Sequence, residues 1–150
     1  MNTLPEFEPG LETNERLHVL LVDDNEADNF LHKKVVKRSG LVSRVVSVLS
    51  GKDALTFLKF NHRNDERQPD LILLDINMPG MNGWEFMEEY DLLPPEEKAK
   101  VVVMMLTVSL NPDDRERSEE KELSGFYNKP LTVTAFREIV KKHFPHLIKD

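Results

Sequence analysis

Three short and almost purely apolar runs, each ending at a polar residue, limit the folds open to this chain more than any other feature. They cover residues 18–22, 70–75 and 100–107, and Asp23 and Asp24 follow the first. Runs that are continuous rather than alternating are typical of parallel strands, because helices cover both faces of such a sheet. The sequence therefore predicts an α/β protein rather than an all-β or all-helical one.

Helical patterns separate these runs. Ala27, Leu31 and Val35 recur at every fourth residue and Gly40 follows, which predicts an amphipathic helix with a glycine stop. By the same criteria we expect helices near residues 51–60, 82–92, 113–124 and 132–144, and two more strands near 42–49 and 125–129. Five strands alternating with five helices predict one doubly wound domain with a five-stranded parallel sheet.

The domain is expected to span residues 16–150. Residues 1–15 contain several glutamates, two prolines and no apolar periodicity, so we expect an acidic, flexible N-terminal tail.

Composition excludes several classes of function. The 150 residues carry a net charge of −7, which disfavours nucleic-acid binding because phosphate backbones require a basic surface. The absence of cysteine excludes disulfides and zinc–thiolate sites. No apolar run is long enough to span a membrane, and the N-terminus lacks the pattern of a secretory signal. We therefore expect a cytoplasmic protein.

Chemically useful side chains stand where the predicted strands end. They are Asp23, Asp24, Asp75, Thr107 and Lys129. The carboxyl ends of parallel strands meet at one edge of a sheet, so these groups should lie together. Clustered carboxylates repel one another unless a cation lies among them, and Mg²⁺ fits oxygen ligands best, with Mn²⁺ as an alternative. A carboxylate can accept a phosphoryl group, and a metal ion and a lysine offset the charge of the transition state.

Taken together, these residues are specific to one family. The chain resembles the receiver domain of two-component response regulators, of the stand-alone type, over about residues 17–148. The resemblance rests on Asp23-Asp24, Asp75, the loop Met78-Pro79-Gly80-Met81-Asn82-Gly83, Thr107 and Lys129-Pro130. It implies a flavodoxin-like fold with strand order 2-1-3-4-5.

The resemblance also implies the metal site and the phosphoacceptor. Asp75 would accept the phosphoryl group. Asp24 would bind Mg²⁺ directly, Asp23 mainly through water, and the main-chain carbonyl of Asn77 would be a further ligand together with Asp75.

Other residues take roles around the phosphoryl group by the same resemblance. Thr107 and Lys129 would contact it, and Phe126 would be the aromatic switch residue. The Lys129–Pro130 peptide bond would be cis. Asn77 and Val108 would modulate access to the site. Val108 departs from the family, in which many members have Ala or Gly at this position, and its β-branched side chain is expected to slow attack by water or small phosphodonors.

One segment departs from the family pattern. The predicted helix near residues 113–124 contains Leu123 as its single apolar residue, so little packing energy holds it against the sheet. We expect a short, mobile or displaced helix with a highly charged surface.

These observations predict a response regulator that takes a phosphoryl group from a histidine kinase or histidine phosphotransfer protein. We expect no DNA-binding domain, and therefore output by protein binding or onward phosphotransfer, as a monomer or a phosphorylation-dependent dimer. It would assist its own phosphorylation and dephosphorylation without being an enzyme on other substrates.

Three alternatives were weighed. A receiver-like module that binds partners without phosphorylation remains open, although this chain keeps every residue that such modules usually lose. An aspartyl-phosphate phosphatase would need a second Asp where Asn77 stands. A flavin-binding protein would need a phosphate-binding loop where the acidic Asp23-Asp24 pair stands.

Overall fold

The computed structural model describes residues 16–106 and 125–148, and the side chains of residues 104–106 are not described. The predicted helix near residues 113–124, the N-terminal tail, Thr107 and Val108 lie outside the described residues. None of the four helices that the described residues contain is long and apolar enough to cross a membrane.

Within the described residues, the predicted strands and helices form where the patterns place them. The strands are β1 (Leu17–Val22), β2 (Val42–Val48), β3 (Leu71–Asp75), β4 (Val101–Leu106) and β5 (Phe126–Asn128). The helices are α1 (Glu26–Arg38), α2 (Gly51–Arg63), α3 (Gly83–Asp91) and α5 (Val133–His143), with 3₁₀ turns η2 (Pro95–Glu97) and η3 (Pro145–Leu147).

All five strands are parallel and hydrogen-bond in the order β2-β1-β3-β4-β5, as predicted. The register places Val22 of β1 beside Leu74 of β3, so the first residues after β1 lie level with the end of β3. This register brings Asp23 close to Asp75.

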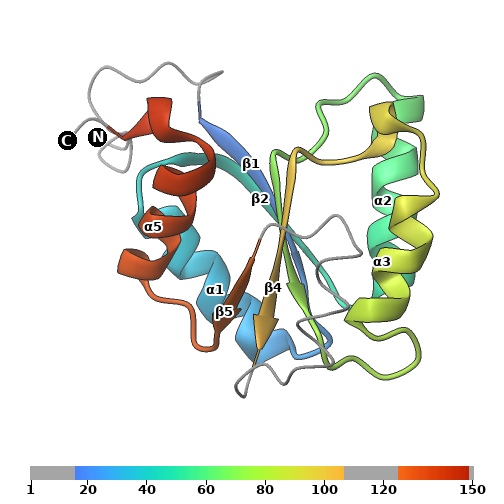
Figure 1. Cartoon of the computed structure of the whole chain (residues 1–150), viewed down its shortest axis with the longest axis horizontal. Helices are drawn as coiled ribbons and strands as arrows, with labels where there is room; N and C mark the ends of the chain where they lie inside the picture. The colour runs from blue at the N-terminus through green and yellow to red at the C-terminus, as the bar shows by residue number, and fades with distance from the viewer. Residues whose placement is uncertain (1–15, 107–124, 149–150) are drawn as a thin grey trace.

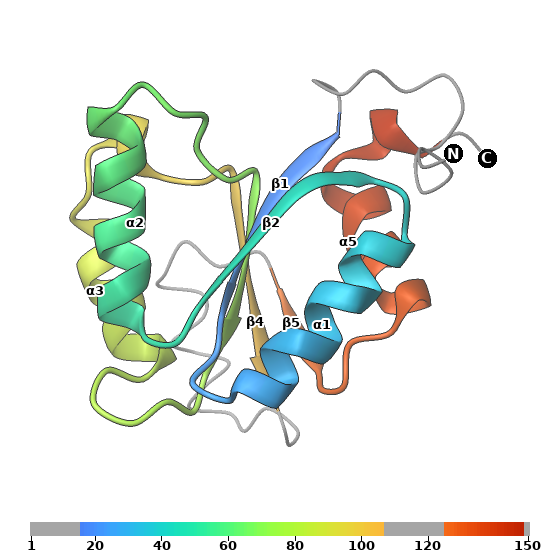
Figure 2. The ribbon, with the colours of Figure 1, turned by 180° about the vertical axis from the view of Figure 1, so that it is seen from behind.

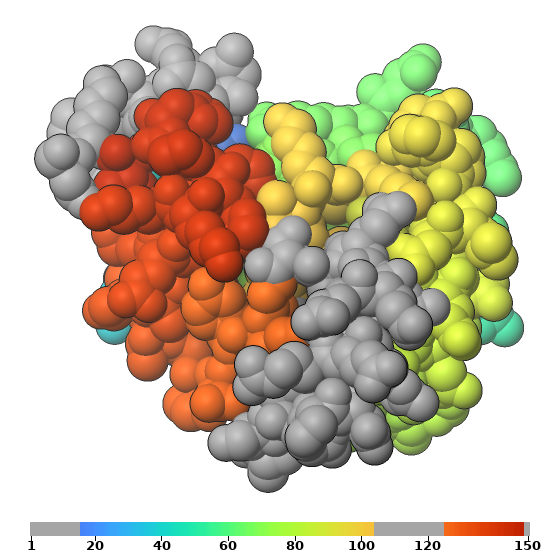
Figure 3. Space-filling view, viewed as in Figure 1, coloured from blue at the N-terminus to red at the C-terminus, as the bar shows by residue number. Residues whose placement is uncertain are grey.

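Helices cover both faces of the sheet. Figures 1 and 2 show α1 and α5 on one side and α2 and α3 on the other. In the space-filling view, α5 (red to orange) and α3 (yellow-green) lie on opposite sides of the molecule (Figure 3). Every residue of β3 is buried, which explains why its sequence is apolar up to Asp75.

Each face has its own apolar core. On the α1/α5 side, Val36 and Phe136 are fully buried among the residues of β1 and β3. On the α2/α3 side, Leu58 and Phe86 are likewise fully buried among residues of β1 and β3. The site at the sheet edge is therefore built on strands that are fixed from both sides.

Side-chain caps fix where the helices begin. Asn25 accepts a hydrogen bond from the Asp28 amide at 3.0 Å, and Ser50 accepts one from the Asp53 amide at 3.0 Å. Asn82 forms a capping box at the start of α3, and Thr132 caps α5. A cap satisfies amides that have no partner within the helix, which sets the starting residue.

Tyr90 joins the end of α3 to the chain that enters β4. Its ring is 1% exposed, and its hydroxyl accepts a hydrogen bond from the Ala99 amide at 2.9 Å. The hydroxyl is also 3.3 Å from the Ala99 carbonyl oxygen, to which it donates.

Replacing Tyr90 with Phe removes this hydroxyl and leaves the Ala99 amide without its partner. We expect the free energy of unfolding to fall by about 1–2 kcal/mol, measured by urea denaturation. An unchanged midpoint would show that water replaces the hydroxyl at no cost.

Candidate functional site

The carboxylates predicted from the strand ends do meet at one edge of the sheet. Oxygen atoms of Asp23, Asp24 and Asp75 lie within 4.8 Å of one another. Asp23 and Asp75 are each 4% exposed, whereas Asp24 is exposed. Asp23 and Asp24 follow β1 and Asp75 ends β3, so the parallel register alone assembles this cluster.

The ammonium of Lys129 lies among carboxylates. Its Nζ atom is 2.7 Å from Asp23 Oδ2, 3.0 Å from Asp28 Oδ2 and 3.4 Å from Asp75 Oδ1. A lysine ammonium has three N–H donors, and three carboxylates surround this one. The side chain of Lys129 is 11% exposed, so water screens these interactions only weakly.

Asp28 is a member of this site that sequence reasoning missed. Its position four residues after Asp24, in the first turn of α1, was the available signal. That signal is weak, because an acidic residue near a helix N-terminus is common for helix stability alone. Only the fold shows that the chain after β5 brings Lys129 to it.

Backbone hydrogen bonds hold the acidic loop in place. The Asn25 amide donates to Asp23 Oδ1 at 2.9 Å. Asn29, which is buried, donates from Nδ2 to the Asp23 carbonyl at 2.9 Å and to the Val48 carbonyl at 3.3 Å, and so links the ends of β1 and β2. The Asn77 amide donates to Asp75 Oδ1 at 3.3 Å.

Burial raises the pKa of Asp75 to about 6, and the charge of Asp23 adds to this increase, while Lys129 and the Asn77 amide oppose it. Burial also disfavours the charged form of Lys129, but hydrogen bonds to Asp23 and Asp28 outweigh it and raise the pKa of that lysine above its ordinary value. Lys129 therefore stays a cation at neutral pH. Ionisation of the buried Asp75 carboxyl group costs free energy in the metal-free protein.

The site suits a hard divalent cation. Its carboxylates outnumber the single ammonium, so the site is electronegative, and its donors are oxygen atoms of the kind that Mg²⁺ prefers. Asp23, Asp24 and Asp75 are the side chains that could hold the ion.

Phe126 begins β5, and Pro130 follows Lys129 after the end of that strand. The ring of Phe126 is partly buried, with its centroid 6.1 Å from that of Trp84 on α3. The Lys129–Pro130 peptide bond is cis. Asn77 is exposed in the loop that follows β3.

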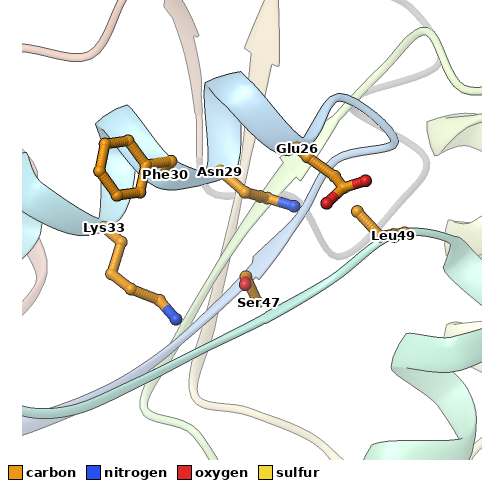
Figure 4. Close-up of a pocket in the computed structure, with 6 residues that line it drawn as sticks. All are labelled: Glu26, Asn29, Phe30, Lys33, Ser47 and Leu49. Atoms are coloured by element: carbon orange, nitrogen blue, oxygen red, sulfur yellow. The ribbon is translucent and has the colours of Figure 1, made fainter.

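A pocket of about 300 Å³ adjoins the acidic loop between α1 and β2. Figure 4 shows Glu26, Asn29, Phe30 and Lys33 projecting from α1, and Ser47 and Leu49 from β2 and the residue after it. The side chains of Phe30 and Leu49 are 59% and 45% exposed, which gives the pocket an apolar rim.

Replacing Asp75 with Asn is expected to stabilise the metal-free protein. The folded-state pKa of about 6 exceeds the ordinary 3.8, so stability due to the protonated group is present below pH 3.8 and is lost as pH rises through 6. At pH 7.5 in EDTA the variant should gain about 1–3 kcal/mol in the free energy of unfolding. The gain should shrink steadily as pH falls from 7.5 to 5.

Urea denaturation across this pH range measures the effect. A difference that does not change with pH would mean that the buried carboxylate is not the cause. Added Mg²⁺ should stabilise the wild type more than the variant, because the variant lacks one anionic ligand.

A family model, related proteins and solved structures are similar to this chain over most of its length. The model of the response regulator receiver domain matches residues 19–141. Response regulator Rcp1 of Synechocystis is 35% identical over 132 residues, which are 87% of this chain and 88% of that protein. A crystal structure of a two-component response regulator from Cytophaga hutchinsonii has a TM-score of 0.77 at 32% identity, covering 87% of this chain and 98% of that one.

A structure of the phosphorylated cyanobacterial phytochrome response regulator RcpA has a TM-score of 0.67 at 31% identity, covering 85% of this chain and 90% of that one. The matched family model, the strand order and the carboxylates at the sheet edge agree with one another. The chain belongs to the response regulator receiver domain family of two-component systems.

Proposed function

We propose that Asp75 is the phosphoacceptor and that a phosphohistidine on a histidine kinase or histidine phosphotransfer protein is the donor. The observation that carries this proposal is a nearly buried carboxylate with Lys129 at 3.4 Å and two further carboxylates around it. Receiver domains generally act as phosphoacceptors rather than as enzymes on other substrates, and the similar protein RcpA has been crystallised in a phosphorylated form.

In the transfer step an oxygen of Asp75 attacks the phosphorus of the phosphohistidine. A P–O bond forms as the P–N bond breaks, and the electron pair of that bond remains on the imidazole nitrogen. The product is an acyl phosphate on Asp75. Lys129, which is a cation at neutral pH, offsets the negative charge on the phosphoryl oxygens.

Receiver domains generally bind Mg²⁺ at an acidic pocket. Here Asp23, Asp24, Asp75 and the main-chain carbonyl of Asn77 would hold Mg²⁺, or alternatively Mn²⁺, and the ion supplies positive charge next to the phosphoryl oxygens. Asp24 is the exposed carboxylate of the three, which suits a ligand at the entrance of the site.

The signal is read by a protein partner. Thr107 contacts the phosphoryl group. Phe126 then changes its packing against Trp84; in the free protein the centroids of the two rings are 6.1 Å apart. The output is protein binding or onward phosphotransfer, and the reaction takes place in the cytoplasm.

The donor docks beside α1. The pocket between α1 and β2 has an apolar rim of Phe30 and Leu49 and adjoins the loop that carries Asp23. Exposed aromatic and aliphatic side chains next to a reactive group are typical of a protein interface. Lys33 at the same pocket adds a positive charge.

A receiver that binds partners without phosphorylation is the alternative. It would share the fold and the docking surface but would not acquire a phosphoryl group.

Intact mass after incubation with acetyl phosphate tests the chemistry. We expect a Mg²⁺-dependent gain of one phosphoryl group in the wild type and no gain in Asp75→Asn. If small donors fail, purified phosphorylated histidine kinases should transfer the group, because Val108 is expected to hinder small donors. Failure with both kinds of donor would favour the alternative.

Replacing Phe30 with Ala tests the docking surface. The rate of transfer from a phosphorylated histidine kinase should fall about tenfold, because exposed aromatic residues contribute strongly to interfaces. The rate with acetyl phosphate should not change.

Phe60→Ala is the matched control, since Phe60 is 58% exposed on α2, across the sheet from α1. Equal transfer rates for the two variants would exclude Phe30 from the interface.

A further inference from the structure

Asp28 lies closer to the ammonium of Lys129 than Asp75 does. Lys129 Nζ lies 3.0 Å from Asp28 Oδ2, closer than the 3.4 Å to Asp75 Oδ1. With Asp23 at 2.7 Å, three carboxylates surround an ammonium that has three N–H donors. Phosphorylation of Asp75 replaces its own contact with Lys129 by the oxygens of a group that carries more negative charge than a carboxylate. Lys129 can give this group a second hydrogen bond only when Asp23 or Asp28 gives up its place.

Asp23 and Asp28 differ in what they lose on release. The side chain of Asp23 is 5% exposed, so an unpaired carboxylate there would be buried. The side chain of Asp28 is 34% exposed, so water can hydrate it after release. Asp28 is the partner whose release costs least.

The helix N-terminus stabilises the negative charge of Asp28 even without Lys129. It lies in the first turn of α1, and its amide donates to the capping Asn25 Oδ1 at 3.0 Å. The amide dipoles at a helix N-terminus stabilise negative charge. Release of Lys129 therefore leaves Asp28 as an ordinary acidic residue near a helix N-terminus, with its backbone held by the cap.

We propose that Asp28 is the exchangeable partner of Lys129: it holds the ammonium before phosphorylation and yields its place to a phosphoryl oxygen on Asp75. Asp28 is then a positioning residue that acts through Lys129 and lowers the affinity of the site for a phosphoryl group. This inference rests on the proposed phosphoacceptor role of Asp75. It predicts that removing the charge of Asp28 strengthens the hold on the phosphoryl group.

The first test measures binding of a phosphoryl mimic rather than transfer. Beryllofluoride is titrated into the full chain with Mg²⁺ by isothermal titration calorimetry. Asp28→Asn should bind about fivefold more tightly than the wild type, because one competing charge–charge contact of a partly exposed pair is gone. Asp28→Glu keeps the charge and should stay close to the wild type.

Asp53→Asn is the matched control. Asp53 occupies the same place in α2 as Asp28 does in α1: it is an acidic residue in the first turn whose amide donates to the capping side chain, Ser50. It makes no ion pair with Lys129. Asp53→Asn removes the same charge from the same kind of position, so a general charge effect would appear in both variants and would overturn the proposal.

The second test follows the phosphorylated form by intact mass. After phosphorylation and removal of the donor, Asp28→Asn should retain the phosphoryl group about fivefold longer than the wild type or Asp53→Asn. A shorter lifetime or weaker beryllofluoride binding would mean that Asp28 helps Lys129 rather than competing for it, and would overturn the proposal.

The two measurements separate this inference from the proposed function. If Asp28→Asn tightens beryllofluoride binding while no donor phosphorylates the wild type, the change of partner by Lys129 is supported for the phosphoryl mimic and the proposed phosphotransfer fails. If Asp75 is phosphorylated but Asp28→Asn matches the wild type in both measurements, the exchange is wrong and the phosphoacceptor role stands. If beryllofluoride binds to neither protein, the exchange is also wrong.

Discussion

The ammonium of Lys129 holds the site of this receiver domain together. Its contacts with Asp23, Asp28 and Asp75 join residues from β1, α1, β3 and the chain after β5. Without this cation, Asp23 and Asp75 would face each other as buried charges with little to offset their repulsion. The lysine thus makes an acidic cluster tolerable in the free protein, and in the proposed function it would supply positive charge to the phosphoryl group.

The sheet holds the residues around Lys129 in fixed positions. β3 is buried along its whole length, and apolar cores on both faces fix it and β1. The acidic loop is held further by hydrogen bonds from Asn25 and Asn29. A carboxylate at the end of such a strand keeps its position, so the proposed transfer would need little reorganisation of Asp75.

The charges around Asp75 set how readily this carboxyl group ionises in the free protein. Burial raises the pKa of Asp75 to about 6, so the ionised acceptor is less stable than an exposed carboxylate. A divalent cation bound among the carboxylates would relieve that cost. In the proposed exchange, the Lys129–Asp28 pair would work in the opposite direction, because Asp28 holds the ammonium in the free protein.

The sequence alone determined the fold class, the strand order through the family resemblance, and the meeting of Asp23, Asp24 and Asp75, because apolar runs and parallel register are local and repetitive signals. The roles predicted for Thr107 and Val108 remain predictions, since these residues lie outside the described part of the chain. Only the tertiary structure decided that Asp28 shares Lys129 with the strand-end carboxylates. That contact joins residues about a hundred positions apart, and no local pattern encodes which side chain of a helix faces a loop from the far end of the chain.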